Sequence, residues 1–132
     1  MNHDGMNLVH LVILAALTQY IWFGRLVGKM RVKHGIKAPS TAGHPEFERM
    51  FRVHQNTLEL LVILVPALMI CAHEFDARLA VGCGIVFIVA RGLYLREYLG
   101  EPRSRRLGFT LSATPIIIAM LGGAWGALRG YF

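Results

Sequence analysis

The stretch that decides the fold runs from Thr57 to His73 and reads TLELLVILVPALMICAH. It is apolar almost throughout, and with the residues just before it reaches the roughly 20 residues that a helix needs to cross a hydrocarbon core of about 30 Å. The exception is Glu59, near its start. An ionisable side chain costs about 2.5–3.5 kcal/mol at the centre of a membrane helix, so it is retained where it faces a partner, a cavity or a polar ligand. Glu59 is therefore a candidate functional residue.

Three more apolar blocks surround this stretch, and together they predict the fold class. The chain of 132 residues is 55% hydrophobic. Its apolar residues come in long blocks, without the broken spacing of soluble amphipathic helices. We predict an all-α membrane protein in which residues 1–132 form a single domain, a four-transmembrane-helix bundle. The helices are expected at roughly residues 7–29, 47–73, 77–99 and 105–129.

Basic residues gather around two of the three expected loops. Around the first loop lie Arg25, Lys29, Arg31, Lys33, Lys37, Arg49 and Arg52, and around the third lie Arg96, Arg103, Arg105 and Arg106. Because Lys and Arg accumulate on the cytoplasmic side of membrane proteins, loops 1 and 3 are expected to face the cytoplasm. Basic residues there also meet the head groups of membrane lipids. Nucleic acid is not expected as a partner of helices immersed in lipid.

Two rows of polar side chains interrupt the second and third blocks at helical spacing. Their members are Arg52, Asn56 and Glu59 in the second block and Arg91, Tyr94 and Tyr98 in the third. Residues three or four apart share one face of a helix, and both rows climb toward the basic side, so we expect them to converge in one polar pocket. Its guanidinium groups, single carboxylate, amide and phenols suit a small zwitterion with surplus carboxylates.

A purely structural interpretation stays open beside this one. Glu59 and an arginine can form an intramembrane ion pair that locks helices together, and both interpretations can hold at once. His54, close to the expected membrane surface, is typical of a satisfied polar residue. No group of His, Cys, Asp or Glu has the spacing of a metal site, so we expect no metal.

The segment from Phe47 to Glu59, which reads FERMFRVHQNTLE, is more specific. It resembles the signature of the membrane-associated proteins in eicosanoid and glutathione metabolism, the MAPEG family, and is most similar to the microsomal glutathione transferase branch. The similarity covers nearly the whole chain. It continues in Ala90, Arg91, Tyr94 and Tyr98 and in the basic turn before Leu107-Gly108-Phe109-Thr110.

The resemblance implies a four-helix protomer that assembles as a homotrimer, with glutathione bound between neighbouring subunits near the cytoplasmic face. By position, it implies that glutathione contacts Arg31, Arg52, His54, Asn56, Glu59, Arg91, Tyr94 and Tyr98. Glutathione is then a co-substrate of the enzyme, and its two carboxylates and one ammonium fit the charges of the two rows.

The resemblance also implies a catalytic arginine just before the fourth helix, which stabilises the glutathione thiolate. Counting back from Phe109 favours Arg105, and Arg106 is the alternative. A thiol with a pKa of about 8.5 is only slightly ionised at neutral pH, and a guanidinium nearby in a poorly solvated site lowers that pKa by about one unit or more. The implied activity is that of a glutathione transferase or peroxidase, in which the thiolate attacks a hydrophobic electrophile or a lipid hydroperoxide.

The chain departs from the family pattern at Leu60, where some members carry an aromatic residue, so leukotriene or prostaglandin synthesis is not expected. Its short loops and termini are typical of a bacterial inner-membrane enzyme. One rival class is a non-catalytic lipid-binding scaffold of the same family, and the retained Arg105 and complete glutathione row argue against it. The other is a small multidrug transporter. That class is expected to carry an acidic residue in its first span, and residues 7–27 contain none.

Overall fold

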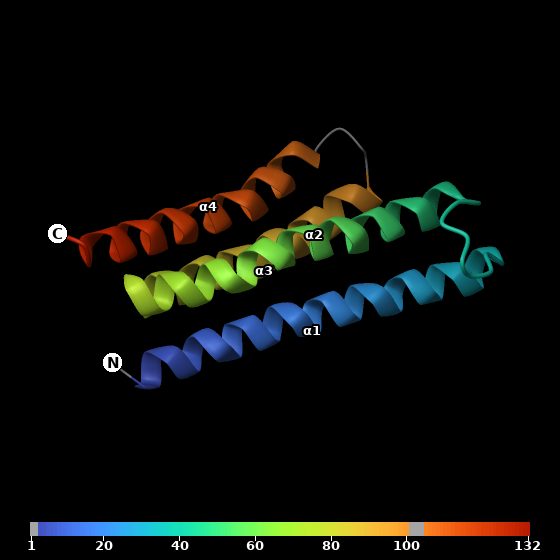
Figure 1. Cartoon of the computed structure of the whole chain (residues 1–132). Coiled ribbons are helices and arrows are strands. Elements are labelled where there is room, and N and C mark those ends of the chain that lie inside the picture. The colour runs from blue at the N-terminus through green and yellow to red at the C-terminus, as the bar shows by residue number, and fades with distance from the viewer. Residues whose placement is uncertain (1–2, 101–104) are drawn as a thin grey trace.

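The computed structural model describes residues 3–100 and 105–132, except for the side chain of Arg105. Four α-helices make up most of this part of the chain: α1 spans His3–His34, α2 Pro45–Glu74, α3 Ala77–Leu99 and α4 Arg105–Arg129. They run lengthwise beside one another, with both termini at one end of the bundle and the α1–α2 loop at the other (Figure 1). All four are long and apolar enough to cross a membrane. The prediction of an all-α membrane protein with four transmembrane helices is confirmed.

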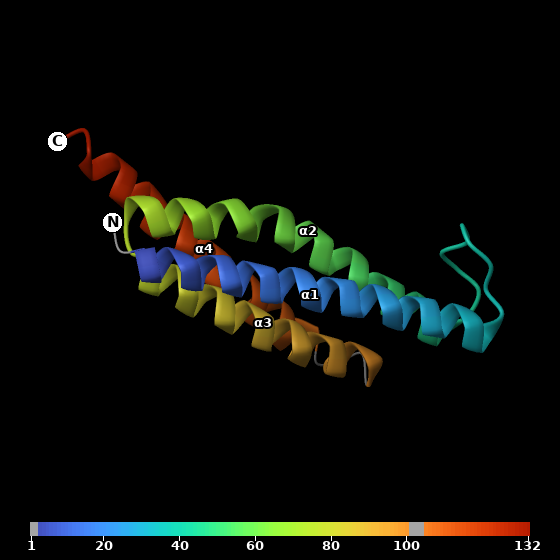
Figure 2. The ribbon, with the colours of Figure 1, turned by 90° about the horizontal axis from the view of Figure 1, so that it is seen from below.

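Two of the helices are longer than their apolar blocks. α1 extends from His3 to His34, beyond both ends of the block expected for it, and α2 begins early, at Pro45. Hydropathy detects the part of a helix that lies in lipid, whereas capping groups set where the helix ends. Here His44 caps α2, because its Nδ1 accepts a hydrogen bond from the backbone N–H of Glu46 at 3.2 Å. As a result, α1 and α2 continue past the end of α3 (Figure 2).

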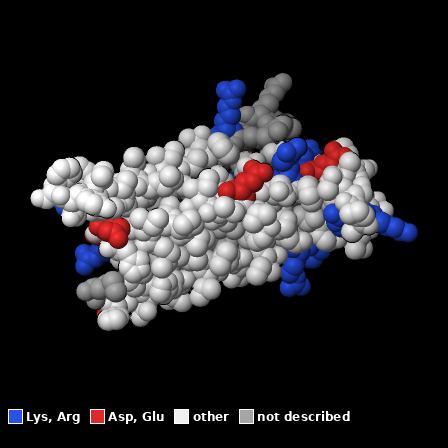
Figure 3. Space-filling model, viewed as in Figure 1, with Lys and Arg blue, Asp and Glu red and all other residues white. Residues whose placement is uncertain are grey.

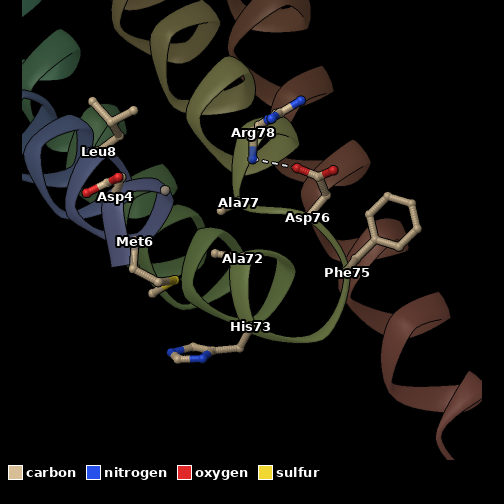
Figure 4. Close-up of a pocket in the computed structure, with 10 residues that line it drawn as sticks. Asp4, Met6, Leu8, Ala72, His73, Phe75, Asp76, Ala77 and Arg78 are labelled. Carbon is tan, nitrogen blue, oxygen red and sulfur yellow. Dashed lines mark hydrogen bonds between the residues drawn. The ribbon is translucent and has the colours of Figure 1, made fainter. Parts of the chain in front are cut away.

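A tight turn joins α2 to α3 at the end of the bundle that carries the termini. Asp76 caps α3, since its carboxylate accepts hydrogen bonds from the backbone N–H groups of Arg78 at 2.6 Å and Leu79 at 3.3 Å. A cavity of about 510 Å³ lies between this turn and the first turns of α1. Figure 4 shows Asp4 and Met6 of α1 across from the turn. None of the predicted site residues that the structure describes lines this cavity.

α2 and α3 form the centre of the bundle, because α1 and α4 each pack against both of them. Two apolar clusters fill the interior. The cluster nearer the termini includes Leu64 and Phe87, and the one nearer the α1–α2 loop includes Phe23 and Met50. Among the described residues, the buried polar or charged side chains are Thr57, Arg91 and Ser112. Along α2 and α3, Thr57 and Arg91 separate the two clusters.

The outer surface of the bundle is strongly apolar. Large side chains that are more than half exposed include Leu11, Ile21, Val62, Val89 and Leu121. The face in Figure 3 is largely uncharged apart from an acidic patch near its middle, and most of its Lys and Arg atoms lie toward the end with the α1–α2 loop. So large an exposed apolar surface suits a protein surrounded by hydrocarbon.

The close approach of α4 to the end of α2 gives a first testable prediction. A Cβ atom at Gly126 would collide with the backbone carbonyl of Glu74, whereas a Cβ atom at Gly28 meets nothing within 4 Å. We expect Gly126→Ala to lower the free energy of unfolding by roughly 1–3 kcal/mol, because backbone atoms cannot yield as a flexible side chain does. The control Gly28→Ala should leave that free energy unchanged or raise it by about 1 kcal/mol. Thermal unfolding in detergent measures both variants. Equal unfolding midpoints for Gly126→Ala and Gly28→Ala would contradict the close approach of α4 to the end of α2.

Candidate functional site

We call Arg52, Asn56 and Glu59 the α2 row and Arg91, Tyr94 and Tyr98 the α3 row. The α2 row lies on the outer face of its helix. Arg52 and Glu59 are exposed and Asn56 is half-buried, whereas Thr57 on the same helix is fully buried against α3. With 3.6 residues per turn, Glu59 lies roughly 160° around the helix from Thr57. The row therefore points away from the side of α2 that packs on α3. In a membrane this face lies against lipid or against another chain.

The charged members of this row have no ion-pair partner among the described residues. In the described part of the chain, the ion pairs join Lys33 and His34 to Glu46, and neither Arg52 nor Glu59 takes part in one. Asn56 has a buried Oδ1 that accepts no hydrogen bond from any described group. Such an atom costs about 1–3 kcal/mol, so it is expected to meet a polar partner from outside the protomer. The ion pair considered for Glu59 is thus not formed among the described residues.

Arg91 occupies the opposite kind of position, fully buried where α2, α3 and α4 meet. Its Nε and Nη2 donate to the hydroxyl of Thr57 at 3.2 and 2.9 Å, and its Nη1 donates to the hydroxyl of Ser112 at 3.4 Å. Each hydroxyl donates in turn to a backbone carbonyl four residues earlier in its own helix, at 2.7 and 2.6 Å. The guanidinium carbon lies 4.1 Å from the centroid of the Tyr94 ring. One cation therefore ties three helices together.

Tyr94 and Tyr98 continue this row toward the start of α4. Tyr94 is buried, and the centroids of the two rings lie 5.4 Å apart. α4 comes close to them at Gly108, where a Cβ atom would lie 2.9 Å from the Cα atom of Tyr94. The backbone N–H of Gly108 also donates to the carboxylate of Glu97 at 3.1 Å. The glycine lets the first turn of α4, which begins at Arg105, pack next to the tyrosines.

Among the described residues the two polar rows face different ways, so the single pocket that their spacing predicts stays a prediction. Spacing shows which residues share a face of a helix, but it does not show which way that face points. The α2 row faces outward, whereas Arg91 and Tyr94 of the α3 row face the interior.

His54 and Arg31, also predicted as site residues, lie nearer to α1. His54 is half-buried and stacks on Tyr20, with ring centroids 4.3 Å apart. Arg31 lies near the end of α1, where its Nη1 donates to the carbonyl of Ser40 at 2.6 Å. Its guanidinium carbon lies 4.7 Å from the centroid of the Phe47 ring. These contacts hold Arg31 between the α1–α2 loop and the start of α2.

The two arginines considered for catalysis lie in the first turn of α4. Arg106 is exposed. Arg105 is the first residue of the helix, and its side chain lies outside the described residues. The backbone therefore brings both positions to the end of the bundle that carries Tyr98, and the choice between them stays a prediction.

Two groups of polar residues were not predicted from the sequence. The first is Thr57 and Ser112, for which the available signal was the preference for small hydroxyl residues at contacts between membrane helices. The second is His34, His44 and Glu46, which each offer a ligand atom within 4.8 Å of the others. Its members lie in two helices and the loop between them, so a search for the short spacings of metal sites did not detect it.

The fold and the polar rows define a four-helix integral-membrane protein. The chain belongs to the MAPEG family, whose family model matches residues 9–125. It is 34% identical over 125 residues to microsomal glutathione S-transferase 2 of Bos taurus, which covers 91% of this chain and 86% of that protein. An uncharacterized protein of Synechocystis is 36% identical over 96 residues, covering 73% of this chain and 70% of its own. Leukotriene C4 synthase of Cavia porcellus is 31% identical over 104 residues, covering 79% and 67%. The family resemblance seen in the sequence is confirmed.

The contact between Arg91 and Thr57 gives a second prediction. We expect Thr57→Val to lower the free energy of unfolding by about 1–3 kcal/mol, because two N–H groups of a buried cation lose their acceptor. Thr114→Val is a matched control, since the Thr114 hydroxyl makes the same bond to its own helix, at 2.7 Å, but is exposed. Thermal unfolding in detergent compares the two variants. Equal losses would show that the contact with Arg91 adds nothing.

Proposed function

We propose that this protein is a membrane-bound glutathione transferase, with peroxidase activity, that activates glutathione as a thiolate for attack on hydrophobic electrophiles or lipid hydroperoxides. Family membership supports the proposal, as does the similarity to proteins named as a microsomal glutathione S-transferase and a leukotriene C4 synthase. The observation that carries it is the outward-facing α2 row, in which Arg52 and Glu59 have no ion-pair partner among the described residues.

The chemistry of glutathione fits this row. Glutathione carries two carboxylates, one ammonium and a thiol, and an arginine binds a carboxylate through two parallel hydrogen bonds. Arg52 would bind a carboxylate, Glu59 would bind the ammonium, and the buried Oδ1 of Asn56 would accept from an amide or ammonium N–H. The ligand would thus supply partners that the described residues do not.

A homotrimer would complete the site. The α2 row of one subunit faces outward, so a neighbouring subunit can bring the last turn of its α3 and the first turn of its α4 against it. Tyr94 and Tyr98 would then line the site together with Arg31 and His54. Arg91 is enclosed by its own protomer, so we propose that it acts by holding Tyr94 in place beneath the ligand.

Arg105, or alternatively Arg106, would stabilise the thiolate. The thiol proton passes to solvent, and the sulfur forms a bond to the electrophilic carbon while the leaving group departs with its electron pair. With a hydroperoxide, the thiolate attacks the O–O bond. The alkoxide that leaves takes up a proton, and the glutathione sulfenic acid reacts with a second glutathione to give the disulfide and water.

We further propose that loops 1 and 3 and the active site face the cytoplasm of a bacterial inner membrane. The concentration of Lys and Arg at the loop end of the bundle supports this orientation (Figure 3). Glutathione would enter from the water at this end, and the second substrate would enter from the surrounding lipid.

The catalytic assignment is tested by thiolate absorbance. Glutathione is added to the purified protein in detergent, and the ultraviolet thiolate band is followed at neutral pH. The parent protein should give a saturable band, and Arg105→Ala should remove it, because the thiol pKa returns toward about 8.5 without the guanidinium. Arg106→Ala is the matched control and should keep the band.

Each other outcome has a distinct meaning. Loss of the band in Arg106→Ala alone would assign catalysis to Arg106. A full band in both variants would contradict thiolate stabilisation by this turn. A folded parent protein without any band would favour the non-catalytic lipid-binding scaffold.

A further prediction concerns Glu59. Glu59→Gln keeps the shape of the side chain but removes its charge, so the affinity for glutathione should fall roughly tenfold to hundredfold, which corresponds to about 1.5–3 kcal/mol for a charged hydrogen bond. Glu74→Gln, at the far end of the same helix and also exposed, should bind as the parent does. Calorimetric titration measures the affinity, and native mass spectrometry checks that each variant remains a trimer. Unchanged affinity in a trimeric Glu59→Gln would contradict the assigned role.

A further inference from the structure

Three side chains with metal-binding chemistry meet where α1 ends and α2 begins. His34 is the last residue of α1, His44 is the N-cap of α2, and Glu46 lies in the first turn of α2. One ligand atom from each lies within 4.8 Å of the other two. This group, which we call the loop-1 triad, shares no residue with the proposed glutathione site.

The three side chains of the triad lie close enough together to reach one metal ion after their rings turn. His34 Nε2 donates to the carboxylate of Glu46 at 2.9 Å, and the rings of His34 and His44 stack with centroids 3.6 Å apart and planes 11° apart. Zinc binds imidazole nitrogen and carboxylate oxygen at about 2.0–2.2 Å, which places two tetrahedral ligand atoms roughly 3.3 Å apart. The stacked rings must open so that both nitrogens point at one ion. His44 is exposed, so its ring has room to turn.

The triad already attracts a cation. The ammonium of Lys33 lies 3.0 Å from both carboxylate oxygens of Glu46. The Lys33 side chain is 58% exposed, so it can turn into solvent. An exposed ion pair of this kind contributes only about 0–1 kcal/mol, which a metal ion bound to three ligands readily exceeds.

We propose that His34, His44 and Glu46 bind a zinc ion that fastens the end of α1 to the start of α2. Two imidazoles and one carboxylate form a donor set that suits zinc, and water completes the tetrahedron. The proton on His34 Nε2 is released to water or replaced by one on Nδ1 when that nitrogen binds the metal. Because Arg31 lies one turn before His34 and donates to Ser40, the ion also stiffens the loop that holds Arg31.

Zinc binding by the purified protein tests this site. The full chain, without a histidine tag, is freed of metal with a chelator and titrated with Zn²⁺ in detergent against a coloured zinc indicator. The parent should take up one Zn²⁺ per chain in the micromolar range. Co²⁺ in its place should give the visible absorption of a tetrahedral site. A parent that binds neither ion at saturable stoichiometry overturns the proposal.

Matched variants assign the ligands. His44→Asn removes the imidazole but keeps a side-chain oxygen that can cap α2. His34→Gln removes the second imidazole. Removing a group that only hydrogen-bonds to a metal ligand lowers metal affinity about 10–100-fold. Removing a ligand itself should cost at least as much, so each variant should bind Zn²⁺ at least tenfold more weakly than the parent. His73→Gln, at the opposite end of the bundle, should bind as the parent does. Equal binding by His44→Asn and the parent would overturn the site.

Protease protection provides a readout that is independent of both affinity and enzymatic activity. Lys37 is exposed in the loop between the two helices and is a site for trypsin. Zn²⁺ should slow cleavage there severalfold in the parent and not in His44→Asn, which also controls for any effect of the metal on trypsin. Cleavage that Zn²⁺ does not slow in the parent would contradict the fastening of loop 1.

Discussion

The guanidinium of Arg91 is a charged group that is enclosed in apolar surroundings where α2, α3 and α4 come together. It must therefore be given acceptors. The hydroxyls of Thr57 and Ser112 supply them, and because each hydroxyl donates to its own helix, its lone pairs are left for the cation. The Tyr94 ring covers the remaining face. Apolar side chains tolerate small shifts of one helix along another. The hydrogen bonds of Arg91 are directional, so they form at only one relative position of the three helices. The cation thus fixes how the three helices fit together.

The way in which α2 is turned against α3 also determines where the other charges lie. Thr57 must face α3, so Arg52 and Glu59, on the far side of α2, must face outward. In lipid an unpaired charge is costly, and a protomer alone offers these two no partner among the described residues. The interior contact that fixes α2 against α3 therefore also places these two charges on the outer face of the bundle.

Much of the fold follows from the sequence because lipid leaves few alternatives: an apolar block of about 20 residues must be a helix there. The sequence also shows that Arg52, Asn56 and Glu59 share a face. It does not show where that face points, since that depends on the contact between Arg91 and Thr57, which come from different helices. The ends of α1 were missed for a related reason. Hydropathy does not detect the part of a helix that continues into water, because its residues there are polar.

The helices are arranged differently at the two ends of the bundle. At the end with the termini, Asp76 caps α3 directly and Gly126 lets α4 approach the backbone of α2, so α2 and α4 pack closely there, while a cavity separates the α2–α3 turn from α1. At the other end, α1 and α2 continue past α3 and carry the polar side chains with them (Figures 1 and 2). Arg31 lies at this extension. Arg52 lies beside the last turns of α3, because Thr57 contacts Arg91 and the residues that flank Arg52 pack against Tyr94 and Leu95. A charged, water-soluble ligand such as the proposed glutathione would therefore reach the α2 row from the end where α1 and α2 extend beyond the apolar core.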